Sequence, residues 1–420
     1  MVPKGWSESY LGEVVTYKKG YAFNSSLYTE EGIRIVRISD TTRDSIHSDN
    51  PVFIAGGNVE GLEQYSLFEN DIILSTVGSR PHLLDSMVGK AVKVPRSAHN
   101  SLLNQNLVKL IPKKTKITNE YLFSMLKKKE FIQFISNLVR GNANQVSITL
   151  ADLFKYKFIL PSLPEQNKIT QILSTWNKAI SVTENLLANS QQQKKALMQQ
   201  LLTGRRRLLD DHGVRFSGEW RSGPLGSLVG RIYGGGTPSR ANSGLWGGDI
   251  PWVTVKDLIS PRINGAQEYI NEIGLAESAS NLVLAGTVII ATRMAVGKTV
   301  MASCDVAINQ DLKAICASEY VCSEYIFNWF LLHAEQIAKM GTGSTVKGVQ
   351  VEAIKALNMT IPKAIEEQQK IAAVLSAADA EISTLEKKLT CLKDEKKALM
   401  QQLLTGKRRV KVEAEEAVSA

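Results

Sequence analysis

Glycine-flanked polar loops are the stretches of this 420-residue chain whose residue types suit binding of a polyanion. Residues 234–240 read GGGTPSR, residues 341–347 read GTGSTVK and residues 140–145 read RGNANQ. Glycine lets the backbone approach a phosphate closely, and Arg, Asn, Gln, Ser and Thr hold phosphates and read base edges. Ordinary turns share this composition. The last two loops occupy matching places in an internal repeat, which favours nucleic-acid binding over simple turns.

Basic residues also follow predicted strands. Ser79 and Arg80 end one strand-like run, Arg293 ends its match, and Arg37 is paired in the same way with Lys256. An Arg just past a strand end either reaches a groove or is solvated, and both readings stay open. The basic clusters at 127–129 and 205–207 are interpreted as solvated faces or helix ends. The candidate nucleic-acid contacts are Arg37, Arg43, Ser79, Arg80, Arg140, Asn142, Asn144, Gln145, Thr237, Ser239, Arg240, Lys256, Arg293, Thr342, Ser344 and Lys347.

Signatures of catalysis are missing from the sequence. Residues 295–299 (AVGKT) resemble the end of a phosphate-binding loop, but Thr292 stands where its first glycine belongs. The chain has no Gly-rich dinucleotide fingerprint and no Asn/Asp-Pro-Pro-Tyr/Phe motif of amino-methyltransferases. The five histidines do not cluster with metal-ligand spacing. We therefore expect no catalytic residue, no metal and no cofactor in this chain.

The composition is that of a globular protein with a basic balance. The formal net charge is +9, which suits a polyanion partner without requiring one. No apolar run is long enough for a membrane span, and residues 1–10 do not resemble a signal peptide. The four cysteines show no CxxC spacing, which indicates incidental thiols in a reducing cytoplasm.

An internal repeat must position these loops. Residues 194–207 (KKALMQQLLTGRRR) recur at 396–409 (KKALMQQLLTGKRR), and the offset of 202 holds from Glu165 to Arg207. Upstream the offset drifts between 204 and 217, so the copies differ there by insertions. The order is globular domain, helix, globular domain, helix. Divergent loops indicate binding, and a fixed helix length indicates a ruler or a shared interface.

The two repeated segments are predicted to be long helices. Apolar residues recur in alternating steps of four and three from Ile371 to Leu403, and less regularly from Ile169 to Leu201. Ser162 and Glu165 suggest a capping box, and Gly204 suits a helix end. Each narrow seam needs a partner. We expect the two helices to pair antiparallel, although each could instead pack on its own domain.

The predicted fold is therefore α/β, with two α/β domains alternating with two long helices that pair as an antiparallel, pseudo-twofold coiled coil. The expected boundaries are 1–160 for the first domain, 161–207 for the central helix, 208–360 for the second domain, 361–409 for the C-terminal helix and 410–420 for a disordered tail without an assigned role.

Over nearly all of residues 1–409, the chain resembles the specificity subunit of type I restriction–modification systems. The resemblance rests on the two-copy layout, on the helix start LPSLPEQ at 160–166, on the helix end ALMQQLLTG, and on GTPS at 236–239 and IPWVTVKD at 250–257. The second helix start, IPKAIEEQ at 361–368, departs by one inserted residue and lacks the second proline.

The resemblance implies a division of labour. Each of two target recognition domains would read one half of a bipartite, asymmetric double-stranded DNA target. The helices would space the domains and dock two adenine methyltransferase (modification) subunits, and restriction subunits would join them. S-adenosylmethionine and ATP would be bound by those partners. The leucines taken as partner-binding are Leu197, Leu201, Leu202, Leu399, Leu403 and Leu404. The alternatives are a stand-alone DNA-binding regulator, a coiled-coil scaffold and, least favoured, a self-sufficient methyltransferase or nuclease.

Overall fold

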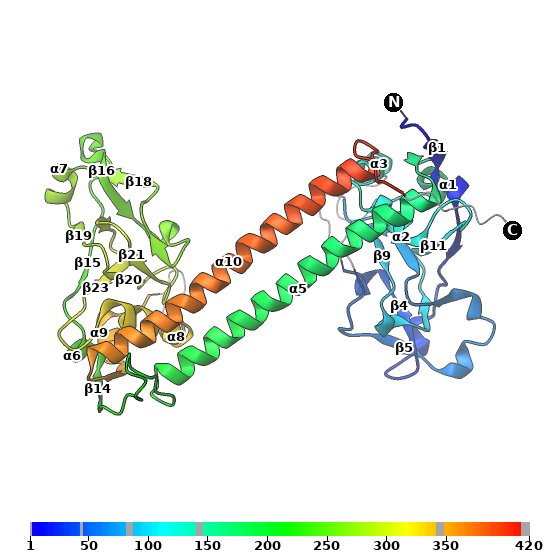
Figure 1. Ribbon diagram of the computed structural model, residues 1–420. Coiled ribbons are helices and arrows are strands. Elements are labelled where there is room, and N and C mark those ends of the chain that lie inside the picture. The colour runs from blue at the N-terminus through cyan, green and yellow to red at the C-terminus, as the bar shows by residue number, and fades with distance from the viewer. Residues whose placement is uncertain (1, 43–44, 81–86, 140–145, 342–347, 413–420) are drawn as a thin grey trace. The chain divides into compact units, whose positions relative to one another are not determined.

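The computed structural model describes residues 2–42, 45–80, 87–139, 146–341 and 348–412 (Figure 1). The candidates that lie outside the described residues are Arg43, Arg140, Asn142, Asn144, Gln145, Thr342, Ser344 and Lys347. Most of the predicted tail also lies outside them. The chain forms two compact units. Unit 1 comprises residues 1–182 and 389–420, and unit 2 comprises residues 183–388. Each unit combines one globular α/β part with one half of each long helix.

Unit 1 is built on short, mostly antiparallel strands. A four-stranded sheet has the order β2 (Val15–Lys19), β11 (Leu107–Pro112), β7 (Ile72–Ser75), β9 (Ala91–Lys93). A five-stranded sheet has the order β3 (Tyr28–Thr29), β5 (Val52–Ile54), β4 (Ile33–Val36), β10 (Ser101–Leu103), β6 (Ser66–Leu67). The remaining pairs are β1 (Ser7–Tyr10) with β13 (Lys157–Leu160) and β8 (Val77–Gly78) with β12 (Val146–Ser147). The helices are α1 (Leu11–Val14), α2 (Asn119–Leu126), α3 (Lys129–Leu138) and α4 (Leu150–Leu153).

Unit 2 repeats this plan. A five-stranded sheet has the order β15 (Ile232–Gly234), β23 (Leu312–Ile315), β20 (Val288–Ala291), β21 (Thr299–Ala302), β17 (Arg262–Ile263). A four-stranded sheet has the order β18 (Glu268–Ile270), β16 (Trp246–Val253), β22 (Val306–Ile308), β19 (Asn281–Val283). β14 (Trp220–Pro224) pairs antiparallel with β24 (Asn358–Pro362), as β1 does with β13. The helices are α6 (Leu225–Leu228), α7 (Glu272–Ala276), α8 (Ser323–Met340) and α9 (Val351–Lys355).

The predicted long helices are α5 (Leu163–Leu201) and α10 (Ile365–Leu404) (Figure 1). In unit 1 the start of α5 shares a core with the end of α10, through Ile169 and Leu403. In unit 2 the end of α5 shares a core with the start of α10, and the Ser190 hydroxyl donates to the Glu381 carboxylate at 3.1 Å. Inside each unit the two segments therefore run antiparallel, which confirms the predicted pairing and the α/β fold class.

The helix ends follow the sequence signals. Gly204 and Gly406 lie just past the two helices with φ of +71° and +70°, a conformation that favours glycine. The central helix ends at Leu201, before the basic run at 205–207 that the predicted boundary included. At the helix start, the Ser162 hydroxyl donates to the Glu165 carboxylate at 3.1 Å.

In unit 1, Glu165 ties the start of α5 to the segment that follows α10. The Arg409 guanidinium donates to its carboxylate, with Nε at 3.0 Å from Oε1. The Trp6 indole N–H donates to the other oxygen at 3.1 Å. Burial alone raises the pKa of Glu165, but hydrogen bonds from Arg409, Trp6 and Ser162 outweigh this and hold the pKa below its ordinary value.

Unit 2 repeats the arrangement at Glu367. The Arg207 guanidinium forms a two-point pair with the Glu367 carboxylate, with Nη2 at 2.7 Å from Oε2. The Glu367 side chain is 0% exposed and that of Arg207 is 20% exposed. Trp220 stands where Trp6 stands, but its indole N–H is buried without a hydrogen-bond acceptor among the described residues. Glu367 thus has fewer partners than Glu165.

The neighbouring glutamines anchor each helix to its own globular part. Gln166 and Gln368 are both fully buried. The Gln166 side-chain oxygen accepts from the Thr118 backbone N–H at 2.8 Å, and that of Gln368 accepts from Cys322 at 3.0 Å. The Glu-Gln pair at the start of each helix is therefore a structural joint.

The leucines expected to dock a partner have another use. Leu201, Leu202, Leu403 and Leu404 are at most 3% exposed and belong to the cores of the two units. Leu197 and Leu399 are partly buried against the same cores. This corrects the prediction for Leu201, Leu202, Leu403 and Leu404, because side chains buried in these cores have no surface left for another subunit. For Leu197 and Leu399, which are partly exposed, partner binding stays a prediction.

Candidate nucleic-acid interface

Four segments of unit 2 meet at one polar edge. The Thr237 hydroxyl, in the glycine-rich loop after β15, donates to the Gln310 side-chain oxygen at 2.8 Å. Arg293, just past β20, lies 3.5 Å from Asp311 in the same turn as Gln310. Arg293 also forms an isolated β-bridge with Gly348. The loop, the turn, the strand end and the segment after residue 347 are therefore neighbours.

Thr292 holds this edge together. Its backbone N–H and its hydroxyl both donate to the Asp311 carbonyl, at 2.8 Å and 3.1 Å. Its carbonyl accepts from the Val349 N–H at 2.9 Å. One threonine at the strand end therefore fixes the turn on one side and the late segment on the other.

Unit 1 builds the same edge with different side chains. The Thr76 N–H and hydroxyl donate to the Asn106 carbonyl at 2.8 Å and 3.0 Å, and the Thr76 carbonyl accepts from the Ile148 N–H at 3.0 Å. The Gln105 N–H donates to the Tyr21 carbonyl at 2.8 Å, which joins the turn to the loop after β2. The two units thus share a scaffold and differ in what they display on it.

Glycine is required where the loops cross the turn. A Cβ added to Gly235 would lie 1.7 Å from the Ile308 carbonyl oxygen, and one added to Gly20 would lie 1.9 Å from that of Asn104. Neither approach leaves room for a side chain. The glycines of these loops therefore serve close packing of the backbone within the protein, whatever they do toward a ligand.

Gln105 and Gln310 were missed as candidates. Both are exposed at this edge, in turns that read NQNL and NQDL. The signal was the recurrence of Asn-Gln in both copies, which marked the repeat but was not taken as a site. Glutamine is well suited to base edges because it carries both a donor and an acceptor.

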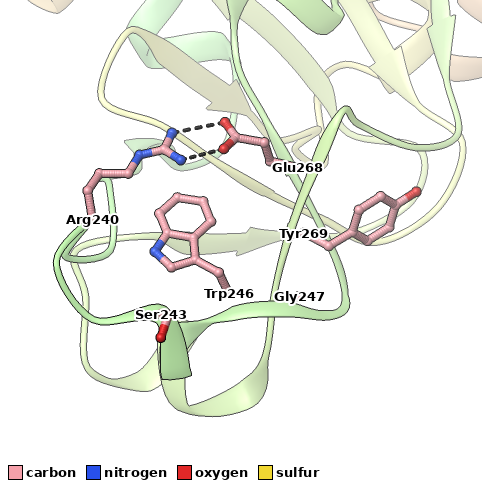
Figure 2. A pocket seen from close by; sticks show the side chains of 6 residues that line it. All are labelled: Arg240, Ser243, Trp246, Gly247, Glu268 and Tyr269. Atoms are coloured by element: carbon pink, nitrogen blue, oxygen red, sulfur yellow. Dashed lines mark hydrogen bonds and ion pairs between the residues drawn. The ribbon is translucent and has the colours of Figure 1, made fainter.

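Arg240 lies in a second polar cluster of unit 2, shown in Figure 2. Its guanidinium stacks 4.0 Å from the centre of the Trp246 ring and forms a two-point pair with the Glu268 carboxylate, with Nη2 at 2.9 Å from Oε2. The hydrogen bond from Arg240 is the main cause that lowers the pKa of Glu268. An open hollow of about 370 Å³ is lined by Arg240, Ser243, Trp246, Gly247, Glu268 and Tyr269.

The remaining candidates have mixed surroundings. Arg80 and Lys256 are exposed, and the Ser239 carbonyl accepts from the Trp246 indole N–H at 3.1 Å. Ser79 forms a β-bridge with Met87. Contact of these four residues with DNA stays a prediction.

Arg37 has a clear structural role. Its Nη2 lies 2.8 Å from Asp40 and 3.0 Å from the Asn50 carbonyl, and its backbone N–H donates to Asp40 at 2.8 Å. The side chain is 29% exposed. Arg37 therefore holds the turn between β4 and the next loop. In unit 2 its place before the short helix is taken by Thr254, and not by Lys256, with which the sequence paired it.

The described ranges contain no group of three or more His, Cys, Asp or Glu side chains placed to hold a metal ion. No helix in that part of the chain has the length and apolar character needed to cross a membrane.

Comparison with known proteins gives a consistent result. The family model described as type I restriction modification DNA specificity domain matches residues 3–189 and 218–393. A type I restriction enzyme specificity subunit (MjaX) of Methanocaldococcus jannaschii is 24% identical over 418 residues, covering 98% of this chain and 95% of the relative. The EcoR124I/EcoR124II specificity subunit of Escherichia coli is 29% identical over 168 residues, covering 38% of this chain and 41% of the relative.

Solved structures share the fold. A chain from a structure concerned with complex assembly and conformational transition of the type I R-M system superposes with a TM-score of 0.59 at 19% identity, covering 97% of this chain and all of the other. The type I restriction–modification S subunit of M. genitalium gives a TM-score of 0.57 at 13% identity, covering 95% and 96%. The two matched ranges, each of which includes the first part of one long helix, span most of the sequence. The chain therefore belongs to the DNA specificity subunits of type I restriction–modification systems.

Proposed function

We propose that each unit reads one half of a bipartite double-stranded DNA target through the edge built around Thr76 in unit 1 and Thr292 in unit 2. The observation that carries this proposal is the repetition of that edge with different side chains beside the shared glutamines. Unit 1 presents the exposed Tyr21 and Asn106, whereas unit 2 presents the exposed Thr237 and the partly buried Asp311. A shared scaffold with distinct side chains suits two readers of unlike sequences.

The chain acts in this proposal as a non-catalytic specificity subunit. Methyltransferase subunits carry the modification chemistry and bind S-adenosylmethionine, and restriction subunits bind ATP. The nearly equal lengths of the repeated helices, 39 and 40 residues, support a ruler that sets the spacing of the half-sites. Half-sites on one face of DNA lie about 34 Å, one helical turn, apart.

Phosphate contacts supply much of the affinity in this proposal. The net charge of +9 favours association with DNA, and each neutralised phosphate releases counterions. The affinity should therefore fall steeply with salt, while the exposed polar side chains of the two edges select the sequence.

Exchange of a single side chain in each edge tests the proposal. Cells that carry this chain with an adenine methyltransferase subunit of its system are mapped for methylated adenines. Gln105→Ala should relax one half of the methylated motif and Gln310→Ala should relax the other. Gln133→Ala, an exposed position on α3, is the matched control and should leave the motif unchanged. A motif that survives both edge substitutions intact would refute reading through these edges.

A further inference from the structure

The Arg240 guanidinium is held in place from two sides. Glu268 on β18 binds both of its terminal nitrogens, and Trp246 at the start of β16 lies beneath its plane (Figure 2). Trp246 is itself fixed, because its indole N–H donates to the Ser239 carbonyl and its ring packs edge-on against buried Trp252 at 5.1 Å. An arginine fixed in this way loses little entropy when it binds a partner.

The charge balance decides which partner suits it. Glu268 neutralises Arg240, so a phosphate brought to this place would meet a carboxylate as well as a guanidinium. A neutral base edge carries no such penalty. The Arg240 side chain is 55% exposed and borders the open hollow, so it remains accessible.

The remaining donors have a defined geometry. The pair with Glu268 uses Nη1 and Nη2, one to each carboxylate oxygen. A guanidinium has five N–H groups, so this pairing leaves three: the Nε–H and the second N–H of each terminal nitrogen. The Nε–H and the second N–H of the terminal nitrogen on the same side form a lateral edge with two parallel donors. Guanine presents the matching pair of acceptors, O6 and N7, in the major groove.

We infer that Arg240 reads a guanine in the half-site of unit 2, with Glu268 and Trp246 as positioning residues. This inference rests on the proposed function. Arg240 lies three residues after Thr237, in the same glycine-rich loop that joins the edge around Thr292. The corresponding loop of unit 1, residues 20–27 (GYAFNSSL), contains no arginine or lysine, so the reader belongs to one half-site.

Selection from duplexes with a randomised centre tests the inference on the purified full-length chain. The wild-type chain should select a guanine at one position of the half-site read by unit 2. Arg240→Ala should reduce that preference by about 5- to 150-fold, the range for one bidentate base contact, and leave the other half-site unchanged. Arg240→Lys keeps the charge and the contact with Trp246 but lacks the planar fork, so it should lose most of the same preference. The Arg240→Lys variant keeps the test decisive if Arg240→Ala disturbs folding.

Glu268→Gln tests the positioning role. It keeps the size of the side chain but removes the two-point pair that holds the Arg240 guanidinium. The preference should therefore fall at that same position, and no new preference should arise elsewhere. Lys256→Ala is the control for a general electrostatic effect, and it should weaken all sequences alike and reduce the salt dependence.

Two results would overturn the inference. Folded Arg240→Lys and Glu268→Gln chains that keep the guanine preference would remove Arg240 as the reader. A loss spread over every position, together with a lowered melting temperature, would reduce the cluster to a packing role. A wild-type chain that selects no sequence would instead refute the proposed reading function itself, and this inference with it.

Discussion

Replacing Arg207, which pairs with Glu367, should destabilise the protein far more than replacing Arg409, which pairs with Glu165 in the other repeat. Arg207→Met removes the cation that pairs with Glu367 and keeps most of the side-chain volume. The Glu367 carboxylate is 0% exposed, and among the described residues both of its hydrogen bonds come from Arg207. Breaking a buried pair from one side costs about 3–5 kcal/mol. For a unit of this size that corresponds to a fall in melting temperature of about 6–20 °C.

Arg409→Met is the matched variant in unit 1. In this variant the Glu165 carboxylate keeps the hydrogen bonds from Trp6 and Ser162. Arg409 is 40% exposed, so removing its guanidinium leaves a less deeply buried carboxylate without its cation. We expect a cost of about 1–2 kcal/mol. Calorimetry of the full-length chain measures both variants under the same conditions.

The double variant Arg207→Met/Glu367→Gln checks the cause. It removes the buried charge together with its partner, so most of the lost stability should return. The reasoning is refuted if Arg409→Met costs as much as Arg207→Met, or if the double variant is no more stable than Arg207→Met alone.

Three further outcomes follow from the contacts. Glu165 has a pKa held below its ordinary value of 4.5, so its carboxylate contributes stability above about that pH and loses it as the pH falls through the lowered value. Denaturant midpoints measured across the acid range should show this decline, and Glu165→Gln should flatten it. Gly235→Ala should cost about 3 kcal/mol in thermal unfolding, because its Cβ would overlap a backbone carbonyl, whereas Gly56→Ala, which meets open space, should change little. Thr237→Val removes the hydrogen bond to Gln310, so it should weaken DNA binding by about 0.5–1.5 kcal/mol in titrations, with the loss confined to the half-site of unit 2; an equal loss at both half-sites would contradict the assignment.

The helices were predictable because their signals are local and repeated. The four-three spacing from Ile371 to Leu403 fixes a helix and an apolar seam without any knowledge of the rest of the chain. Gly204 and Gly406 marked the ends for the same reason. The spacing also predicted that the two helices pair with each other. It did not show that the helix ends are buried in the globular parts, so Leu403 was assigned to a docking surface although it completes a core.

The site was only partly predictable because it is assembled from distant segments. The glycine-rich loop and Arg293 were identified from composition and place in the repeat. Gln310 was not identified, because it lies 73 residues from Thr237 in the sequence and only the fold brings the two side chains together. Arg37 shows a second limit. A basic residue after a strand resembles a DNA contact, but the spacing could not reveal that Nε and Nη2 of Arg37 donate to Asp40 and to the Asn50 carbonyl.

The discontinuity of unit 1 has a consequence for the order in which the protein is made. Unit 2 is one continuous stretch, residues 183–388, whereas unit 1 needs residues from both ends of the chain. Leu403 and Leu404 complete the core of unit 1, and Arg409 completes the joint at Glu165. At about 5–20 residues per second, the ribosome needs roughly 10–40 s to pass through unit 2. During that time the N-terminal part of unit 1 lacks the end of α10, which has not yet been synthesised, and its core is incomplete. Unit 1 is therefore begun first and completed last. A chain that ended after residue 388 would contain all of unit 2, whereas unit 1 would lack the part of α10 that completes its core.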